Sequence, residues 1–152
     1  MDRDELLRYL RTRRYAVEAS VTLGGAPQAA IVGIAVTDAF ELVFDSLETS
    51  RKMQNLRANH RVAFVIGGTD GSDERTAQYE GIADEPRGVA LDRVKQQYFR
   101  VFPDGRDRER WPGITYVRVT PVWIRFSDYS TNPPVIVEFS SGDLTADSVV
   151  DA

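Results

Sequence analysis

Residues 42–66 read LVFDSLETSRKMQNLRANHRVAFVI, and this stretch predicts a strand, a helix and a second strand in succession. The apolar run through Phe44 is typical of a buried strand, and a hydroxyl-rich turn follows it. Thr49 or Ser50 can cap a helix that continues to about Ala58, with Met53 and Leu56 facing inward. Asn59 is expected to end the helix in a left-handed conformation before a strand over 61–66.

The start of this predicted helix carries an unusual charge. Arg51 and Lys52 fall in its first turn, where the helix dipole disfavours cations by about 0.3–1 kcal/mol each. A bound anion would remove the conflict, and phosphate is the usual anion at a helix N-terminus. Ser46, Thr49 and Ser50 add hydroxyl donors. A capped helix start that faces solvent explains the same residues without a ligand, and the sequence leaves both interpretations open.

Upstream of this stretch, the pattern predicts a short helix over 2–14 and then a β-meander. In the first strand, 15–23, apolar residues at odd positions alternate with Ala16, Glu18, Ser20 and Thr22. The turn at 24–27 leads to a second, more apolar strand over 28–36, and a tight turn at 38–39 leads to the strand that ends at Phe44.

Downstream, further strands are expected at 76–85, 114–120, 122–126 and 134–139, and a helix over 88–102 that Pro103 ends. Polar or charged loops separate them at 67–75 and 104–110, and residues 140–152 are expected to form a flexible tail. Many strands with few helices indicate a β-rich α+β domain, an antiparallel sheet closed into a small barrel with two or three outer helices. Residues 1–152 are expected to form this single domain.

Composition excludes several classes of site. The 152 residues include no cysteine and one histidine, His60, which excludes disulfides, thiolate metal sites and histidine clusters. The net charge of −4, and the acidic Asp2, Asp4 and Glu5 beside the arginines of 8–14, argue against nucleic acid as a partner. Long apolar runs and an apolar N-terminal segment are absent, so we expect a cytoplasmic protein without a membrane partner or a metal.

Together these residues carry a resemblance. The segment from Leu42 through Ser50-Arg51-Lys52, Asn55-Leu56 and Arg61–Ala63 resembles the pyridoxamine 5'-phosphate oxidase-like, FMN-binding split-barrel family. Residues 75–81 and 116–121 are similar to two later landmarks of that family. The resemblance runs from about residue 15 to residue 129, with His60 where proline is common.

The resemblance implies a six-stranded split barrel that forms a homodimer with FMN at the subunit interface. By position, Ser46, Ser50, Arg51 and Lys52 would hold the FMN phosphate. Thr76 stands where the family often has a glutamine that reaches the flavin from the second subunit. The strand with Ile31, Val32 and Gly33 would lie along the isoalloxazine ring, with Gly33 permitting close approach. Trp111 would line the substrate side of the flavin, or else pack against the barrel.

The sequence also departs from the oxidases proper. They carry an arginine and a lysine where this chain has Ala30 and Ala35, and a basic C-terminal clamp for the substrate phosphate. From Phe126 onward this chain has no lysine or arginine. We therefore expect an FMN-dependent oxidoreductase acting on a small-molecule substrate or electron acceptor, not a true pyridoxamine phosphate oxidase. No catalytic side chain is identified.

Two alternatives stay open. One is an F420-dependent reductase of the same fold, for which Arg57 or Arg106 would supply further positive charge near Lys52. The other is a non-enzymatic flavin- or haem-binding module, for which His60 would be a poor axial ligand because of its expected place beside the helix end.

Overall fold

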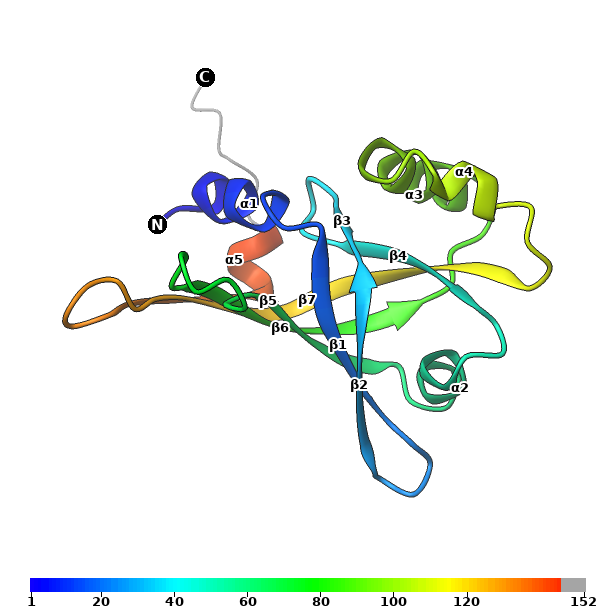
Figure 1. The fold of residues 1–152 in the computed structure, drawn as a ribbon, viewed down its shortest axis with the longest axis horizontal. Helices are drawn as coiled ribbons and strands as arrows, with labels where there is room; N and C mark the ends of the chain where they lie inside the picture. The colour runs from blue at the N-terminus through cyan, green and yellow to red at the C-terminus, as the bar shows by residue number, and fades with distance from the viewer. Residues whose placement is uncertain (146–152) are drawn as a thin grey trace.

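The structure, a computed structural model, describes residues 1–145. Within them the strands form one antiparallel sheet in the order β2-β1-β5-β6-β7-β4-β3, with β8 paired to β7 (Figure 1). The strands are β1 (Tyr15–Val21), β2 (Pro27–Gly33), β3 (Ala35–Val36), β4 (Leu42–Leu47), β5 (Arg61–Gly67), β6 (Arg75–Asp84), β7 (Ile114–Asp128) and β8 (Val135–Ser140). The helices are α1 (Arg3–Arg11), α2 (Arg51–Ala58), α3 (Gly88–Val101), α4 (Gly105–Arg108) and α5 (Ser141–Thr145).

The sheet curls into a half-barrel with the helices at its margins, which confirms the split-barrel α+β class. Figure 1 shows α1 beside α5, α3 beside α4, and α2 next to the β1–β2 hairpin. Residues 1–145 contain eight strands instead of the expected six, and five helices instead of two or three, because the short α4 and α5 add to the three expected ones. No helix in this range has the length and apolar character needed to cross a membrane.

Three expected boundaries are wrong for identifiable reasons. The strands expected at 114–120 and 122–126 are one continuous β7, in which a bulge opposite Glu80 and Gly81 accommodates Pro121. The strand expected at 28–36 is interrupted at Ile34, whose N–H donates to the Arg14 carbonyl (2.8 Å). Asn59 is extended (φ −139°, ψ 112°) and not left-handed; its side chain accepts a hydrogen bond from the Arg61 N–H.

The tail also differs from expectation. Residues 141–145 form α5, in which the Leu144 side chain is buried. The Leu144 carbonyl accepts a hydrogen bond from the Arg3 side chain of α1 (2.7 Å). The apolar contact and the hydrogen bond hold this part of the expected flexible tail in place. The rest of the tail, residues 146–152, lies outside the described residues.

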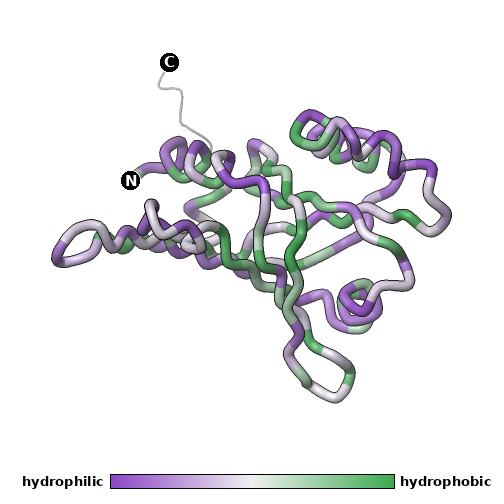
Figure 2. The backbone as a smooth tube through the Cα atoms, in the orientation of Figure 1, coloured by the Kyte–Doolittle hydropathy of each residue, from purple (hydrophilic) through white to green (hydrophobic). Residues whose placement is uncertain are grey.

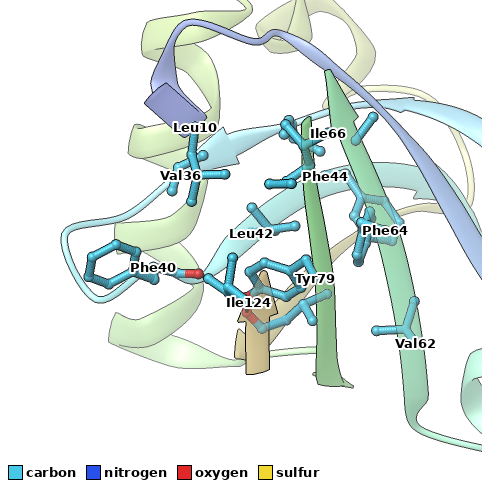
Figure 3. Packing of buried hydrophobic residues seen from close by; sticks show 14 of the residues in the cluster. Leu10, Val36, Phe40, Leu42, Phe44, Val62, Phe64, Ile66, Tyr79 and Ile124 are labelled. Atoms are coloured by element: carbon cyan, nitrogen blue, oxygen red, sulfur yellow. Dashed lines mark hydrogen bonds between the residues drawn. The ribbon is translucent and has the colours of Figure 1, made fainter. Parts of the chain in front are cut away.

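The main core lies inside the curled sheet. Figure 3 shows Phe40, Leu42, Tyr79 and Ile124 packed together there, and all four are fully buried. The Tyr79 hydroxyl lies 2.8 Å from the Phe40 carbonyl and 3.0 Å from that of Val119, so the buried phenol has polar partners. Figure 2 shows the complementary pattern, with hydrophilic residues concentrated on the helices. Apolar packing therefore fills the inner side of the curled sheet.

A second, smaller core lies under α3. Strand β4 alternates, so Leu42 and Phe44 face the main core while Val43 packs in the smaller cluster with α3 residues. Next to Val43 in this layer, Asp45 accepts hydrogen bonds from the Tyr98 hydroxyl (3.0 Å) and from Arg108 Nε (2.9 Å). These bonds fix the end of β4 and hence the point where the chain enters α2.

Strand β1 has its polar face inward. Ala16, Glu18 and Ser20 are buried. On the other face of the strand Tyr15 is 59% exposed, and Val17, Ala19 and Val21 are only half-buried. The register places Glu18 opposite Ala30 of β2 and Phe64 of β5. The buried polar side chains of β1 therefore lie between the sheet and α2, where the sequence predicted a phosphate site.

Candidate functional site

Helix α2 begins as the sequence predicted. Ser50 is its N-cap, with an extended backbone and an Oγ that accepts a hydrogen bond from the Met53 N–H (3.3 Å). The Ser46 and Ser50 hydroxyl oxygens lie 2.9 Å apart, so β4 and the helix start share a pair of hydroxyls. The first turn has no acidic residue, unlike that of α1, which has two. Arg51 and Lys52 thus stand at the positive end of the helix with no carboxylate in that turn.

A cavity of about 220 Å³ lies between this helix start and the β1–β2 hairpin. Two of the four residues predicted to hold phosphate, Arg51 and Lys52, line it. Ser46 and Ser50 lie at the adjoining β4–α2 junction. The remaining wall residues come from β1, β2 and the middle of α2; they are Glu18, Ser20, Gln28, Ala29, Ala30 and Asn55.

The inner wall of the cavity is a hydrogen-bonded polar cluster. Asn55 is buried, and its Nδ2 donates to Ser20 Oγ (3.1 Å) and to Gln28 Oε1 (2.9 Å). The opposite orientation of the Gln28 amide would let its oxygen accept from the Arg51 guanidinium instead. In either orientation the cluster joins α2 to both strands of the hairpin.

Glu18 is the charged group of the wall that sequence reasoning did not identify. Its side chain is buried (1% exposed), and its Oε1 has no hydrogen-bond partner. Burial raises the pKa of this carboxyl, while hydrogen bonding with Ser20 and the charge of Lys52 act in the opposite direction. A carboxylate with a free acceptor atom therefore shares the cavity with two cations.

The residues predicted to lie along a flavin ring are spread over both faces of β2. Ile31 is 67% exposed on the outer face, whereas Val32 is buried in the core. The space that Gly33 leaves is filled by Phe102 of the α3 C-terminus: an added Cβ would lie 2.6 Å from the Phe102 Cζ. The part of β2 that lines the cavity is its first half, 28–30, instead.

Thr76 and Trp111 do not line this cavity. Thr76 is on β6, where its Oγ1 is 3.5 Å from the Ile66 carbonyl. Trp111 is half-exposed in the turn before β7. That turn lies beside the segment leading to α2, since the Glu48 N–H donates to the Gly113 carbonyl (2.7 Å). His60 is exposed at the other end of the helix.

Solved structures share this fold at low sequence identity. A haem-binding protein from Mycobacterium smegmatis superposes with a TM-score of 0.80 at 14% identity, over 95% of this chain and 60% of that one. The chain thus spans less than two thirds of that protein. A pyridoxamine 5'-phosphate oxidase-related, FMN-binding protein from Nostoc punctiforme matches with a TM-score of 0.67 at 12% identity, over 90% and 87% of the two chains.

A third structure, a putative pyridoxamine 5'-phosphate oxidase from Listeria innocua, matches with a TM-score of 0.65 at 22% identity, over 82% of this chain and 96% of that one. At these identities the likeness shows the fold alone. No curated protein matches the sequence. The sequence model described as pyridoxamine 5'-phosphate oxidase matches residues 3–128, most of the chain including the whole candidate site, and the protein therefore belongs to the pyridoxamine 5'-phosphate oxidase family.

Proposed function

We propose that the protein binds FMN and acts as a flavin-dependent oxidoreductase. The observation that carries this proposal is the pair Arg51 and Lys52, which lines a cavity at the N-terminus of α2. Two cations and the free N–H groups of a helix start form a site for a phosphate group. When bound, FMN supplies hydride and electron transfer, and the protein supplies binding, orientation and electrostatics.

The residues present fit the phosphate end of FMN. Ser46 and Ser50 place two hydroxyls at the helix start, and each can donate to a phosphate oxygen by rotating away from the other. Arg51 can bind an anion with two parallel N–H groups, and Lys52 adds a point charge. The positive end of the α2 dipole and the charges of Arg51 and Lys52 therefore lie at the same end of the cavity.

The cavity is too small for the whole cofactor. Its volume of about 220 Å³ is below the ~300–1,000 Å³ of sites that enclose drug-sized ligands. The phosphate and part of the attached chain fit, so the ring system would extend beyond this protomer. A second copy of the chain is the partner that the family resemblance implies, and Thr76 of that copy is our candidate for a contact with the ring.

The outer face of the sheet supports a homodimer. Ile31, Val17 and Val65 pair across β2, β1 and β5, and the next row consists of three alanines. Ile31 and Val65 are 67% and 43% exposed. An apolar array across three strands, open to solvent in a single protomer, is typical of a surface that another protein covers.

Light scattering tests this assembly. Two chains of 17.1 kDa give an expected mass of about 34 kDa. Val65→Glu, on the array, is expected to shift the FMN-loaded protein to the monomer mass, whereas Val89→Glu, at an exposed valine of α3, leaves the dimer intact. A wild-type monomer in the FMN-bound form would contradict the proposal.

Three features of the chain argue against oxidation of pyridoxamine phosphate: Ala30, Ala35 and the composition of the C-terminal segment. Ala30 lines the cavity and Ala35 is buried in the second core, so neither position offers charge to a substrate phosphate. The sequence beyond Arg125 contains no basic residue. We propose that the substrate or electron acceptor has no phosphate group that these segments would have to bind.

FMN fits better than F420. The two arginines expected to help bind the longer anionic tail of F420 have other partners: Arg57 pairs with Glu48 and Glu85, and Arg106 lies over the Phe99 ring. Neither lines the cavity. Haem binding is the second candidate, and the fold likeness to the Mycobacterium smegmatis protein supports it.

The absorbance spectrum of the purified protein, with mass spectrometry of what it releases on denaturation, tests the proposed function. We expect FMN to be released, or to bind when added to cofactor-free protein. Release of a deazaflavin or of haem, with no uptake of FMN, would refute the proposal in favour of one of the alternatives.

A further inference from the structure

We propose that Glu18 makes phosphate binding in the α2 cavity depend on pH: it takes up a proton when a phosphate monoester binds at Arg51 and Lys52. The cavity would therefore bind the phosphate more weakly as the pH rises. This inference rests on the proposed function, because it concerns the same cavity.

The first argument is the position of the carboxyl group. Glu18 lines the same cavity as the two cations, its side chain is 1% exposed, and its Oε1 has no partner. The elements around it supply few other charges. On the paired strands the facing residues are Ala30 and Phe64. Of the charged groups on α2, Arg51 and Lys52 line the cavity, whereas Arg57 pairs with Glu48 and Glu85 outside it. A ligand that enters the cavity therefore meets a carboxyl that water reaches poorly.

The second argument is the charge balance. Two cations and one carboxylate give the described wall a formal charge of +1. A phosphate monoester brings about −1.5 to −2 near neutral pH, which leaves an excess of negative charge inside the cavity. A proton on Glu18 brings the sum close to zero. In addition, a protonated carboxyl can donate a hydrogen bond to a phosphate oxygen, which an ionised one cannot.

The direction of the pH effect follows from linkage. A dianion beside Glu18 favours the protonated form, so the bound state holds more protons than the free state. Affinity then decreases as pH rises above the range in which free Glu18 loses its proton. The upper limit is tenfold in affinity for each pH unit, because one proton is linked.

The experiment measures the FMN dissociation constant of wild type, Glu18→Gln and Asp92→Asn between pH 6 and pH 8.5. Gln keeps the shape of the side chain and removes the titration, while Asp92 is an exposed carboxylate of α3 outside the cavity. The FMN phosphate has its own second pKa near 6, but this titration is common to all three proteins and cancels in their ratios.

We expect Glu18→Gln to bind FMN more tightly than wild type, by a factor that grows with pH and reaches about tenfold at pH 8.5. Asp92→Asn follows wild type at every pH. A ratio for Glu18→Gln that stays within twofold across the range would overturn the inference and leave FMN binding intact. Failure of all three proteins to bind FMN at any pH would instead overturn the proposed function.

A second measurement needs no variant. Calorimetric titration of wild type with FMN at pH 8, in two buffers with different ionisation enthalpies, gives the number of protons taken up on binding. We expect an uptake of up to about one proton, since the phosphate is already a dianion at this pH. Binding with no net proton uptake would contradict the role of Glu18.

Discussion

The replacement Lys52→Ala tests the proposed phosphate site by removing one of the two cations that line the cavity. Loss of a charge-assisted hydrogen bond to the phosphate costs about 1.5–3 kcal/mol, which corresponds to a roughly 13- to 160-fold weaker affinity for FMN. The stability of the cofactor-free protein should change little. Relief of the unfavourable helix-dipole position contributes about 0.3–1 kcal/mol, and loss of the attraction to Glu18 opposes it.

The chain offers a matched control, since Lys95 is the only other lysine. Its Nζ pairs with Glu109 (3.0 Å) and lies 5.4 Å from the centre of the Tyr116 ring, away from the α2 cavity. Lys95→Ala should therefore leave FMN affinity unchanged. The assay is titration of FMN by its fluorescence change, with urea unfolding of each cofactor-free protein. If Lys52→Ala binds FMN within threefold of wild type, Lys52 does not hold the phosphate.

Three further predictions address packing, pH and chemistry. Gly33→Ala should lower the free energy of unfolding by about 1–3 kcal/mol, because the new Cβ would meet the Phe102 ring at 2.6 Å; a change below about 0.5 kcal/mol in urea unfolding would show that the ring moves freely. Glu18→Gln should stabilise the cofactor-free protein more at pH 8 than at pH 5. Burial raises the pKa of Glu18, so the folded chain retains a proton that the unfolded chain releases, and wild-type stability decreases as pH rises through this range; an equal gain at both pH values would contradict this. FMN-loaded protein should not oxidise pyridoxamine phosphate but should accept electrons from NAD(P)H or reduced F420; turnover of pyridoxamine phosphate at about 1 s⁻¹ or faster would show that it is an oxidase after all.

The strand–helix–strand unit around α2 was predictable because its signals are local. A hydroxyl before a helical pattern, two cations in its first turn and the apolar segment 62–66 after the helix depend only on neighbouring positions. The structure places the N-cap at Ser50, one of the two residues predicted for it. Asn59 was misjudged because an asparagine that hydrogen-bonds the backbone two residues later serves as well in an extended conformation as in a left-handed one.

The inner wall of the site was not predictable in the same way. The alternation in β1 is regular, but the usual rule would turn its apolar residues inward, and the structure buries Glu18 and Ser20 instead. Which face a strand turns inward depends on what covers it, and here the polar face of α2 does so through Asn55. The sequence signal that points to Glu18 is the polar side of a regularly alternating strand in a chain that also has a basic helix start.

Gly33 was expected to permit close approach of a flavin ring, and the neighbour in the structure is a side chain of the same chain instead. A glycine in a strand indicates that something approaches the backbone closely, but not what approaches it. In the structure that neighbour is Phe102 from the end of α3, 69 positions away in sequence, which only the tertiary fold could reveal.

Comparison of FMN with riboflavin, by calorimetric titration of the cofactor-free wild-type protein, tests the central claim that Arg51 and Lys52 form a phosphate site. The two ligands differ only in the phosphate. We predict submicromolar affinity for FMN and an affinity for riboflavin at least about tenfold weaker, a difference of about 1.4 kcal/mol or more. Equal affinity for the two ligands would contradict the account.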